Sequence, residues 1–141
     1  DIETKKAEGI KKVFIFAGVN NIGSGKTAEE TIAQLAEMYR LGRAAGMQVV
    51  AATMTSWDTE GYVRKKPDFC GPRGMTAEIL TDRTLKVNAW IREQKENGAI
   101  DGVVDLYQAM GPYDTQEKGL KRSEGRDYVI QDGDVCYFHF R

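Results

Sequence analysis

Short apolar runs alternate along this chain with longer segments in which apolar residues recur at helical spacing. Residues 13–17, 48–55 and 100–107 have the length and the β-branched content of buried strands. The two segments between them, which begin near Thr27 and Thr76, have the period of amphipathic helices. Strands that alternate with helices of this length are expected to be parallel and joined by right-handed crossovers. The sequence therefore predicts an α/β fold with a parallel sheet flanked by helices.

Both predicted helices carry start and stop signals. Thr27 and Glu30 have the spacing of a capping box, in which the hydroxyl and the carboxylate each satisfy a free backbone N–H. Gly46 is placed to end this helix, and Gly98 is placed to end a second helix over residues 76–97. The residues expected on the inner faces are Ile32, Leu35, Ala36 and Tyr39 in the first helix and Leu80, Thr84, Val87 and Ile91 in the second.

Composition limits the class of protein. The chain has 141 residues, 41% hydrophobic and 29% charged, which is typical of one globular domain and not of a disordered segment. A net charge of −1 does not suggest a basic surface for nucleic acid, and no apolar run approaches the length of a membrane span. The chain begins at Asp1 without a signal-like segment, so the sequence leaves open whether the protein is secreted or cytoplasmic. Cys70 and Cys136 lack metal-type spacing and are either free or paired.

The first strand ends in polar residues at a position where open α/β sheets bind ligands. Gly18, Asn20 and Asn21 follow the strand directly. The amide of Asn20 is suited to donate a hydrogen bond to an oxyanion that forms during a reaction. An Asn pair in this place is also typical of simple Asx turns, so the residues alone leave both interpretations open.

Three long segments without strand or helix pattern follow the carboxyl ends of the three strands: residues 18–26, 56–75 and 108–141. The middle segment is long for a compact domain, and such loops are often functional. It contains Trp57, Tyr62 and Phe69, which would form an apolar lip over a pocket. A packed surface loop is the simpler interpretation for any single one of these residues, and we favour it.

Residues 23–27, Gly-Ser-Gly-Lys-Thr, stand between a strand and a helix, as a phosphate-binding P-loop does. That motif requires a further glycine at the position of Asn20, so that backbone N–H groups curl around the phosphates. The nearest preceding glycine, Gly18, is two residues too early. Turn glycines followed by a helix cap at Thr27 explain the same residues, and nucleotide binding is the less favoured alternative.

The two ends of the chain together resemble the SGNH (GDSL-type) hydrolase family. Gly18-Val19-Asn20-Asn21 is similar to the family's Gly-x-Asn-Asp motif, and His139, the only histidine, stands where the family has the His of its final Asp-x-x-His motif. Residues 88–93 and 103–107 resemble the penultimate helix and the last core strand of the family. The similarity thus extends in order over nearly the whole chain. Asn21 and Cys136 replace the usual aspartates, and Gly-Asp-Ser is absent.

The resemblance implies a flavodoxin-like, three-layer α/β/α sheet protein that occupies residues 1–141 as one partial domain, incomplete at both ends. It implies a serine esterase that acts on an acyl or acetyl ester of a carbohydrate or small lipid, with no metal and no organic cofactor. His139 would be the general base, and Asp134, the aspartate we prefer in place of Cys136, would orient it. Asn20 would donate to the oxyanion, and Gly18 and Asn21 would shape its loop.

The nucleophile is expected outside this segment. None of the three serines, Ser24, Ser56 and Ser123, lies in a Gly-x-Ser-x-Gly elbow, and Cys136 as a nucleophile would depend on an irregular loop. A non-catalytic binding or scaffold domain with the same fold is therefore the main alternative function.

An exposed apolar edge is expected at residues 13–16, because a three-stranded parallel sheet leaves its outer strand unpaired. We therefore expect a companion N-terminal segment or a second copy of the chain, besides a small-molecule ester, among the partners. We expect no nucleic acid and no membrane span.

Overall fold

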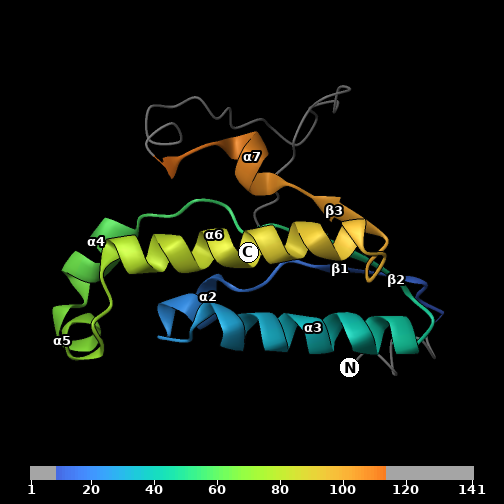
Figure 1. The fold of residues 1–141 in the computed structure, drawn as a ribbon, viewed down its shortest axis with the longest axis horizontal. Coiled ribbons are helices and arrows are strands. Elements are labelled where there is room, and N and C mark those ends of the chain that lie inside the picture. Colours follow the sequence, from blue (N-terminus) through green and yellow to red (C-terminus); the bar gives the residue numbers. More distant parts are fainter. Residues whose placement is uncertain (1–8, 114–141) are drawn as a thin grey trace.

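A computed structural model describes residues 9–113 of the chain (Figure 1). The elements are β1 (Lys12–Ile15), α2 (Val19–Gly23), α3 (Ala28–Ala44), β2 (Gln48–Ala52), α4 (Thr59–Lys65), α5 (Pro67–Cys70), the 3-10 helix η1 (Gly71–Arg73), α6 (Ala77–Glu96), β3 (Gly102–Val104) and α7 (Leu106–Met110). Strands and long helices alternate, which confirms the α/β fold class predicted from the sequence.

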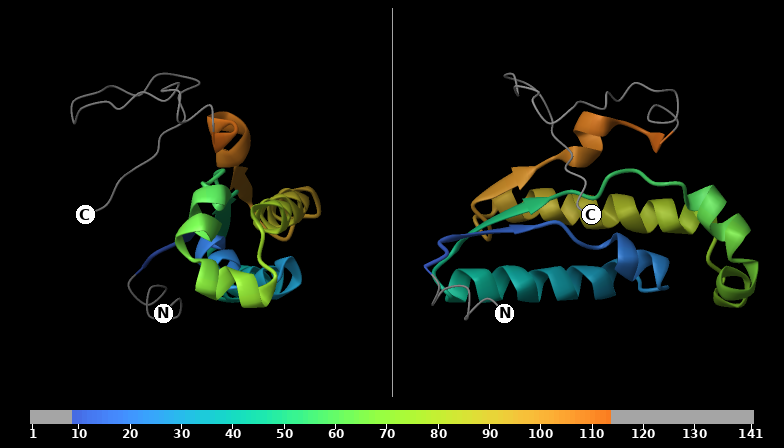
Figure 2. Two further views of the ribbon diagram at one scale, coloured as in Figure 1. Left: turned by 90° about the vertical axis from the view of Figure 1, so that its left-hand side faces the viewer. Right: turned by 180° about the vertical axis from the view of Figure 1, so that it is seen from behind.

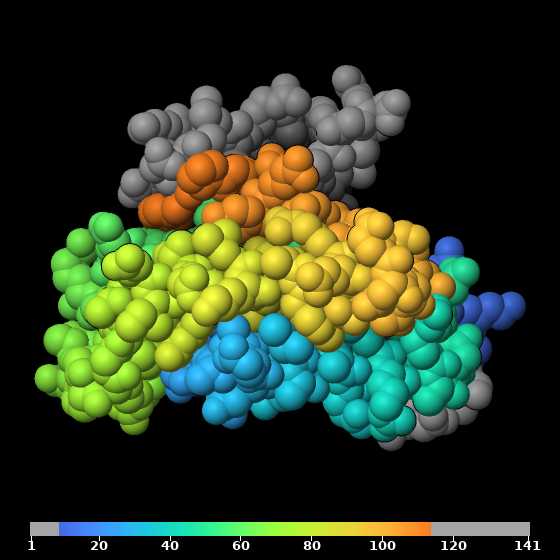
Figure 3. Space-filling model, in the orientation of Figure 1, coloured from blue at the N-terminus to red at the C-terminus, as the bar shows by residue number. Residues whose placement is uncertain are grey.

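The three described strands form one parallel sheet in the order β1-β2-β3. The long helices α3 and α6 make the two crossovers, and both lie on the same face of the sheet, side by side (Figures 1 and 2). Figure 3 shows that the side chains of α3 and α6 cover the sheet when it is viewed from this side. Right-handed crossovers that proceed in one direction across a sheet place their helices on one face, which explains the arrangement.

The core lies between the sheet and these two helices. Ile15, Val49 and Ala51 are neighbours on the helix-covered face, and all three are buried. They pack with apolar residues that recur every three or four positions along the helices: Leu35 and Tyr39 from α3, and Leu80, Val87 and Ile91 from α6. Thr84 is buried as well, so the whole predicted inner face of α6 is confirmed.

The other face of the sheet carries apolar side chains that the described residues leave exposed. Phe14 is 56% exposed, Phe16 is 41% exposed and Val104 is 39% exposed. Phe14 stands beside Val50 in the register of β1 and β2, on the face opposite to Ile15. The apolar surface predicted for residues 13–16 is therefore present at Phe14 and Phe16, whereas Ile15 is buried. The companion segment or second copy expected there stays a prediction.

The ends of the long helices agree with the sequence signals, except that only the hydroxyl half of the predicted Thr27–Glu30 capping box is formed among the described residues. The Thr27 hydroxyl accepts a hydrogen bond from the Glu30 N–H at 3.1 Å, and Thr76 caps α6 in the same way. Gly46 and Gly98, just past the two helix ends, have φ of 78° and 79°. These are the left-handed conformations in which glycine commonly terminates a helix.

The strands are shorter than the sequence pattern predicts, and two of the loops are more regular. Residues 53–55 and 105–107 lie beyond β2 and β3. The Thr53 N–H still donates to the Val104 carbonyl, and after it polar side chains bind the chain in place of a neighbouring strand. Residues 18–26 and 56–75, predicted to be irregular, contain the short helices α2, α4, α5 and η1. Their few residues per helix give too weak an apolar period to detect in the sequence.

Candidate functional site

Gly18 shapes the turn from β1 into α2. Its φ of 127° lies in a region that L-residues with a side chain rarely adopt. A Cβ at this position would stand 2.7 Å from Sδ of Met54, a residue buried at the end of β2. The Gly18 carbonyl accepts the N–H of Ile22 at 3.1 Å and so begins α2. The glycine of the Gly-x-Asn pattern is therefore required by both backbone conformation and space.

The turn places Asn20 and Asn21 in α2, with different surroundings. Asn20 is exposed, and within residues 9–113 its side-chain amide has no hydrogen-bond partner. Asn21 donates a hydrogen bond from its side chain to the Gln34 carbonyl oxygen and so connects α2 with α3. Of the pair, Asn20 is the residue whose amide is available to a ligand, whereas Asn21 has a structural contact.

An open pocket of about 450 Å³ lies beside Asn20, at the carboxyl end of the sheet. It joins the loop after β1 with the segment after β2. The residues that line it are Val19, Asn20, Gly23, Ser24, Trp57, Tyr62, Lys66 and Phe69. The three aromatic residues of the predicted lip are thus brought to Asn20, and they also pack against the core. Both interpretations of residues 56–75 therefore hold for these side chains: they line a pocket, and they pack against the core.

Hydrogen bonds fix two of these aromatic rings. The Trp57 indole N–H donates to the Thr84 hydroxyl at 3.0 Å, and the Tyr62 hydroxyl donates to the Gly23 carbonyl at 2.6 Å. The two rings meet edge to face, with centroids 5.4 Å apart. Gly23 belongs to α2 and Tyr62 to α4, so the bond between them holds the two walls of the pocket together.

The structure argues against a phosphate-binding loop at residues 23–27. The N–H groups of Ser24, Gly25 and Lys26 donate to the carbonyls of Asn20, Ile22 and Asn21, at 2.9, 3.0 and 3.1 Å. A P-loop must instead point such N–H groups at the phosphates. Residues 23–26 therefore end α2 and lead the chain to Thr27, the N-cap of α3. Nucleotide binding is not favoured.

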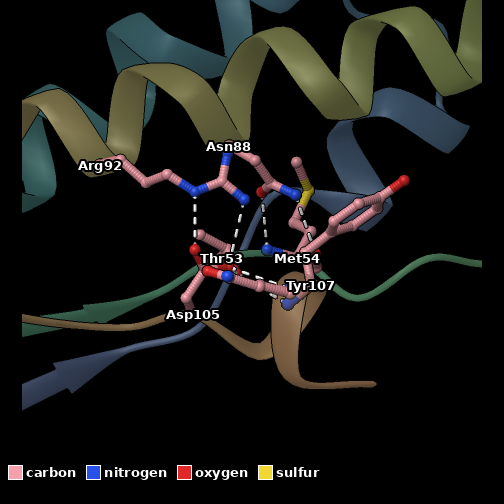
Figure 4. Close-up of polar contacts among 7 residues, drawn as sticks. Thr53, Met54, Asn88, Arg92, Asp105 and Tyr107 are labelled. Atoms are coloured by element: carbon pink, nitrogen blue, oxygen red, sulfur yellow. Dashed lines mark hydrogen bonds and ion pairs between the residues drawn. The ribbon is translucent and has the colours of Figure 1, made fainter. Parts of the chain in front are cut away.

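Asn88 of α6 holds the chain just beyond β2 (Figure 4). Its side-chain oxygen accepts the Met54 N–H at 2.8 Å, and its amide donates to the Met54 carbonyl at 2.9 Å. Both residues are fully buried. The side chain of Asn88 thus takes the place of a neighbouring strand at the backbone of Met54, the residue whose sulfur lies beside Gly18.

Asp105 makes a second polar connection at this edge (Figure 4). It accepts hydrogen bonds from Arg92 at 2.7 and 3.1 Å and from the Thr53 hydroxyl at 3.0 Å. The pKa of the Asp105 carboxyl is lowered, mainly by its hydrogen bonds from the Arg92 guanidinium. Burial opposes this effect, and hydrogen bonds from the Gln108 N–H and the Thr53 hydroxyl add to it. The Thr53 oxygen also accepts the Tyr107 N–H at 3.0 Å. The ionised Asp105 carboxylate therefore connects the end of β2, helix α6 and helix α7 by hydrogen bonds.

Sequence reasoning missed Asn88 and Asp105, although each left a signal. Asn88 stands between Thr84 and Ile91 on the inner face of α6, and a polar residue in such a buried position requires hydrogen-bond partners. The apolar run around Asp105 predicts a strand, but an Asp three residues before a free N–H is also typical of a helix N-cap, and Asp105 caps α7.

Several candidates lie outside the described residues: His139, Asp134, Ser123 and Cys136. Of the described ones, Ser24 donates to the Asn21 carbonyl and Ser56 to the Gly111 carbonyl, both at 2.8 Å. Within residues 9–113, no group of three or more His, Cys, Asp or Glu side chains is arranged to hold a metal ion. None of the helices in this described part of the chain has the length and apolar character to cross a membrane.

Comparisons with known proteins point to one family. The profile of the GDSL-like lipase/acylhydrolase family matches residues 2–140. The chain is also similar to the ribosome-binding ATPase YchF of Haemophilus ducreyi and of Haemophilus influenzae, each 41% identical over 59 residues. Those 59 residues are 39% of this chain and 16% of each relative, so the chain spans a small part of their length.

Proposed function

Because the chain belongs to the GDSL-like lipase/acylhydrolase family, we propose that it forms part of an esterase that hydrolyses a small-molecule ester by acyl transfer to serine. The observation that supports this most is Asn20: its amide is unpaired among the described residues and lines an open pocket at the carboxyl edge of a parallel sheet. Preorganised donors of this kind stabilise the oxyanion of acyl transfer. The sequential strand order also suits a flavodoxin-like sheet.

The proposed mechanism follows the chemistry of serine hydrolases. A serine Oγ from a segment outside these 141 residues attacks the ester carbonyl carbon, and His139 takes the serine proton while Asp134 orients its ring. The carbonyl oxygen becomes an oxyanion, to which Asn20 Nδ2 donates a hydrogen bond. The alcohol leaves with the proton from His139, and water then releases the acid by the same steps. The substrate class is an acyl or acetyl ester of a carbohydrate or a small lipid.

A fluorophosphonate provides the first test, because it reacts covalently only with an activated nucleophile. We expect an adduct in the intact mass of the whole purified protein, and the mass of the labelled species identifies the chain that carries the serine. If no species is labelled, the non-catalytic scaffold alternative replaces the esterase.

Asn20→Ala tests the oxyanion role. Removal of one oxyanion donor typically lowers kcat by about 100-fold to 1000-fold, and we expect KM to change little. Asn97→Ala is the control, because it makes the same change at an exposed residue next to the end of α6 that does not line the pocket. The control is expected to keep activity within about threefold. Equal activity of the two variants would exclude Asn20 as a donor.

A further inference from the structure

We infer that the substrate carries an anionic group that Lys66 binds, while the sugar ring that bears this group packs against Trp57. The inference rests on the proposed function and names its substrate class, an ester of an acidic sugar with a carboxylate. The pocket that contains Asn20 supports it by its charge and by its rigidity.

The pocket has a charge opposite to that of the chain. Among the eight residues that line it, Lys66 supplies a positive charge and none is an acid. Within residues 9–113, Lys66 also has no carboxylate partner in an ion pair. The whole chain, by contrast, has a net charge of −1. A positive pocket on a slightly acidic protein favours an anionic ligand over a neutral or cationic one.

The ammonium group of Lys66 is held near the aromatic wall. Its Nζ lies 4.5 Å from the centroid of the Tyr62 ring and 3.4 Å from the Tyr62 hydroxyl, to which it donates. Tyr62 is itself fixed by its hydrogen bond to Gly23. The Lys66 carbonyl accepts the N–H groups of Phe69 and Cys70 at 3.2 and 2.9 Å, so the backbone at its base is fixed too. Less side-chain freedom is then lost when the ammonium group binds an anion.

The rest of the pocket suits the ring of a sugar. Trp57 is held by Thr84, so its indole N–H is already satisfied and its remaining surface in the pocket is apolar. Aromatic side chains with few rotatable bonds offer large contact area at low entropic cost. One pocket thus combines a hydrogen-bond donor for a carbonyl oxygen, an apolar wall and a cation, supplied in that order by Asn20, Trp57 and Lys66.

The test measures binding, which needs no turnover. The chain has two tryptophans, and Trp90 lies outside the pocket, stacked on Tyr39. In a Trp90→Phe background, Trp57 fluorescence therefore reports on the pocket alone. Methyl β-D-glucuronide and methyl β-D-glucoside serve as the two probes, because they share a ring and differ in one carboxylate.

We expect the glucuronide to bind about threefold to fivefold more tightly than the glucoside, the size expected of a partly solvated ion pair, and the preference to weaken as salt is added. Lys66→Gln should abolish the preference. Lys65→Gln is the matched control: it removes the same charge from the neighbouring exposed residue, which does not line the pocket, and should retain the preference.

Equal affinity for the two probes, binding of neither, or a preference that survives Lys66→Gln would overturn the inference. The outcome is separate from that of the proposed function. A lost preference beside intact fluorophosphonate labelling would reject only the acidic sugar, whereas an intact preference without labelling would reject only the hydrolysis.

Discussion

The interior between the sheet and its two long helices differs from the carboxyl edge of the sheet in what holds it together. The interior is apolar: Ile15, Val49 and Ile91 belong to one continuous cluster. At the carboxyl edge, single polar side chains bind backbone groups, as Asn88 does at Met54 and Tyr62 at Gly23. The stabilisation from apolar packing is distributed over many contacts, whereas each polar connection at the edge consists of only two or three hydrogen-bonding atoms. The edge that carries the candidate site should therefore be more sensitive to single substitutions.

The largest effect is expected for Asn88→Ala. The change leaves the buried N–H and carbonyl of Met54 unpaired, and each unpaired group costs about 1–3 kcal/mol, so we expect a loss of about 4 kcal/mol in the free energy of unfolding. Urea denaturation measures it. Asn97→Ala, an exposed change at the end of the same helix, should cost less than about 1 kcal/mol. Similar losses of unfolding free energy in both variants would contradict the greater sensitivity of the carboxyl edge to single substitutions.

Gly18→Ala comes next. The methyl group meets Met54 Sδ at 2.7 Å in a backbone conformation that disfavours L-residues, and the two effects together should cost about 3 kcal/mol. Gly46→Ala separates them, because Gly46 has a φ of 78° but no atom within 4 Å of the position that a methyl group would take. It should cost about 1 kcal/mol. Thermal unfolding of the two variants compares the values, and a cost at Gly46 as large as at Gly18 would remove the steric part of the argument.

A smaller effect with a pH signature is expected for Asp105→Asn. The native carboxylate is stabilised by Arg92, so its pKa in the folded state is lowered. Its contribution to stability is therefore present above the unfolded pKa of about 3.9 and is lost as the pH falls through the lower folded pKa. At pH 7 the variant should be less stable by about 1.5 kcal/mol. The difference between the two proteins should shrink below about pH 4, and a difference independent of pH would show that charge is not involved.

The smallest effect concerns the interior and has the opposite sign. The buried Tyr39 hydroxyl has no hydrogen-bond partner among the described residues, and burial raises its pKa to about 12. Tyr39→Phe should therefore raise the free energy of unfolding by about 1 kcal/mol.

The same substitution has an alkaline signature. Because the folded pKa of Tyr39 lies above the unfolded value of about 10, the unfolded chain releases this proton first, and the native protein loses stability as the pH rises from about 10 to about 12. The Phe variant lacks this loss, so its advantage in stability should grow over the same range. Denaturation at about pH 8 and about pH 11, on either side of the unfolded pKa, tests this. A Phe variant that is less stable than the native protein at the lower pH would indicate that the hydroxyl has a partner.

The interior could be predicted from the sequence, and much of the edge could not. Leu80, Val87 and Ile91 recur at a regular spacing, and a periodic pattern reports which side chains share a buried face. Gly18 and Asn20 were found through a family motif. The polar connections of the edge join distant positions instead: Asn88 binds Met54 across 34 positions of the sequence, and Asp105 binds Thr53 across 52. The local sequence shows at most that such a residue needs hydrogen-bond partners and does not show which partners they are, so these contacts became visible only in the fold.

The order of the strands in the sheet has a consequence for how the protein folds. Because β1, β2 and β3 pair in the order in which they follow one another, each pairing requires the closure of one helical crossover, and no other strand has to be inserted between the two partners. β2 has a neighbour on both sides, whereas β1 and β3 each have one described neighbour. Amide protons of β2 should therefore exchange with solvent more slowly than those of β1 and β3, and the centre of the sheet should persist when its margins open.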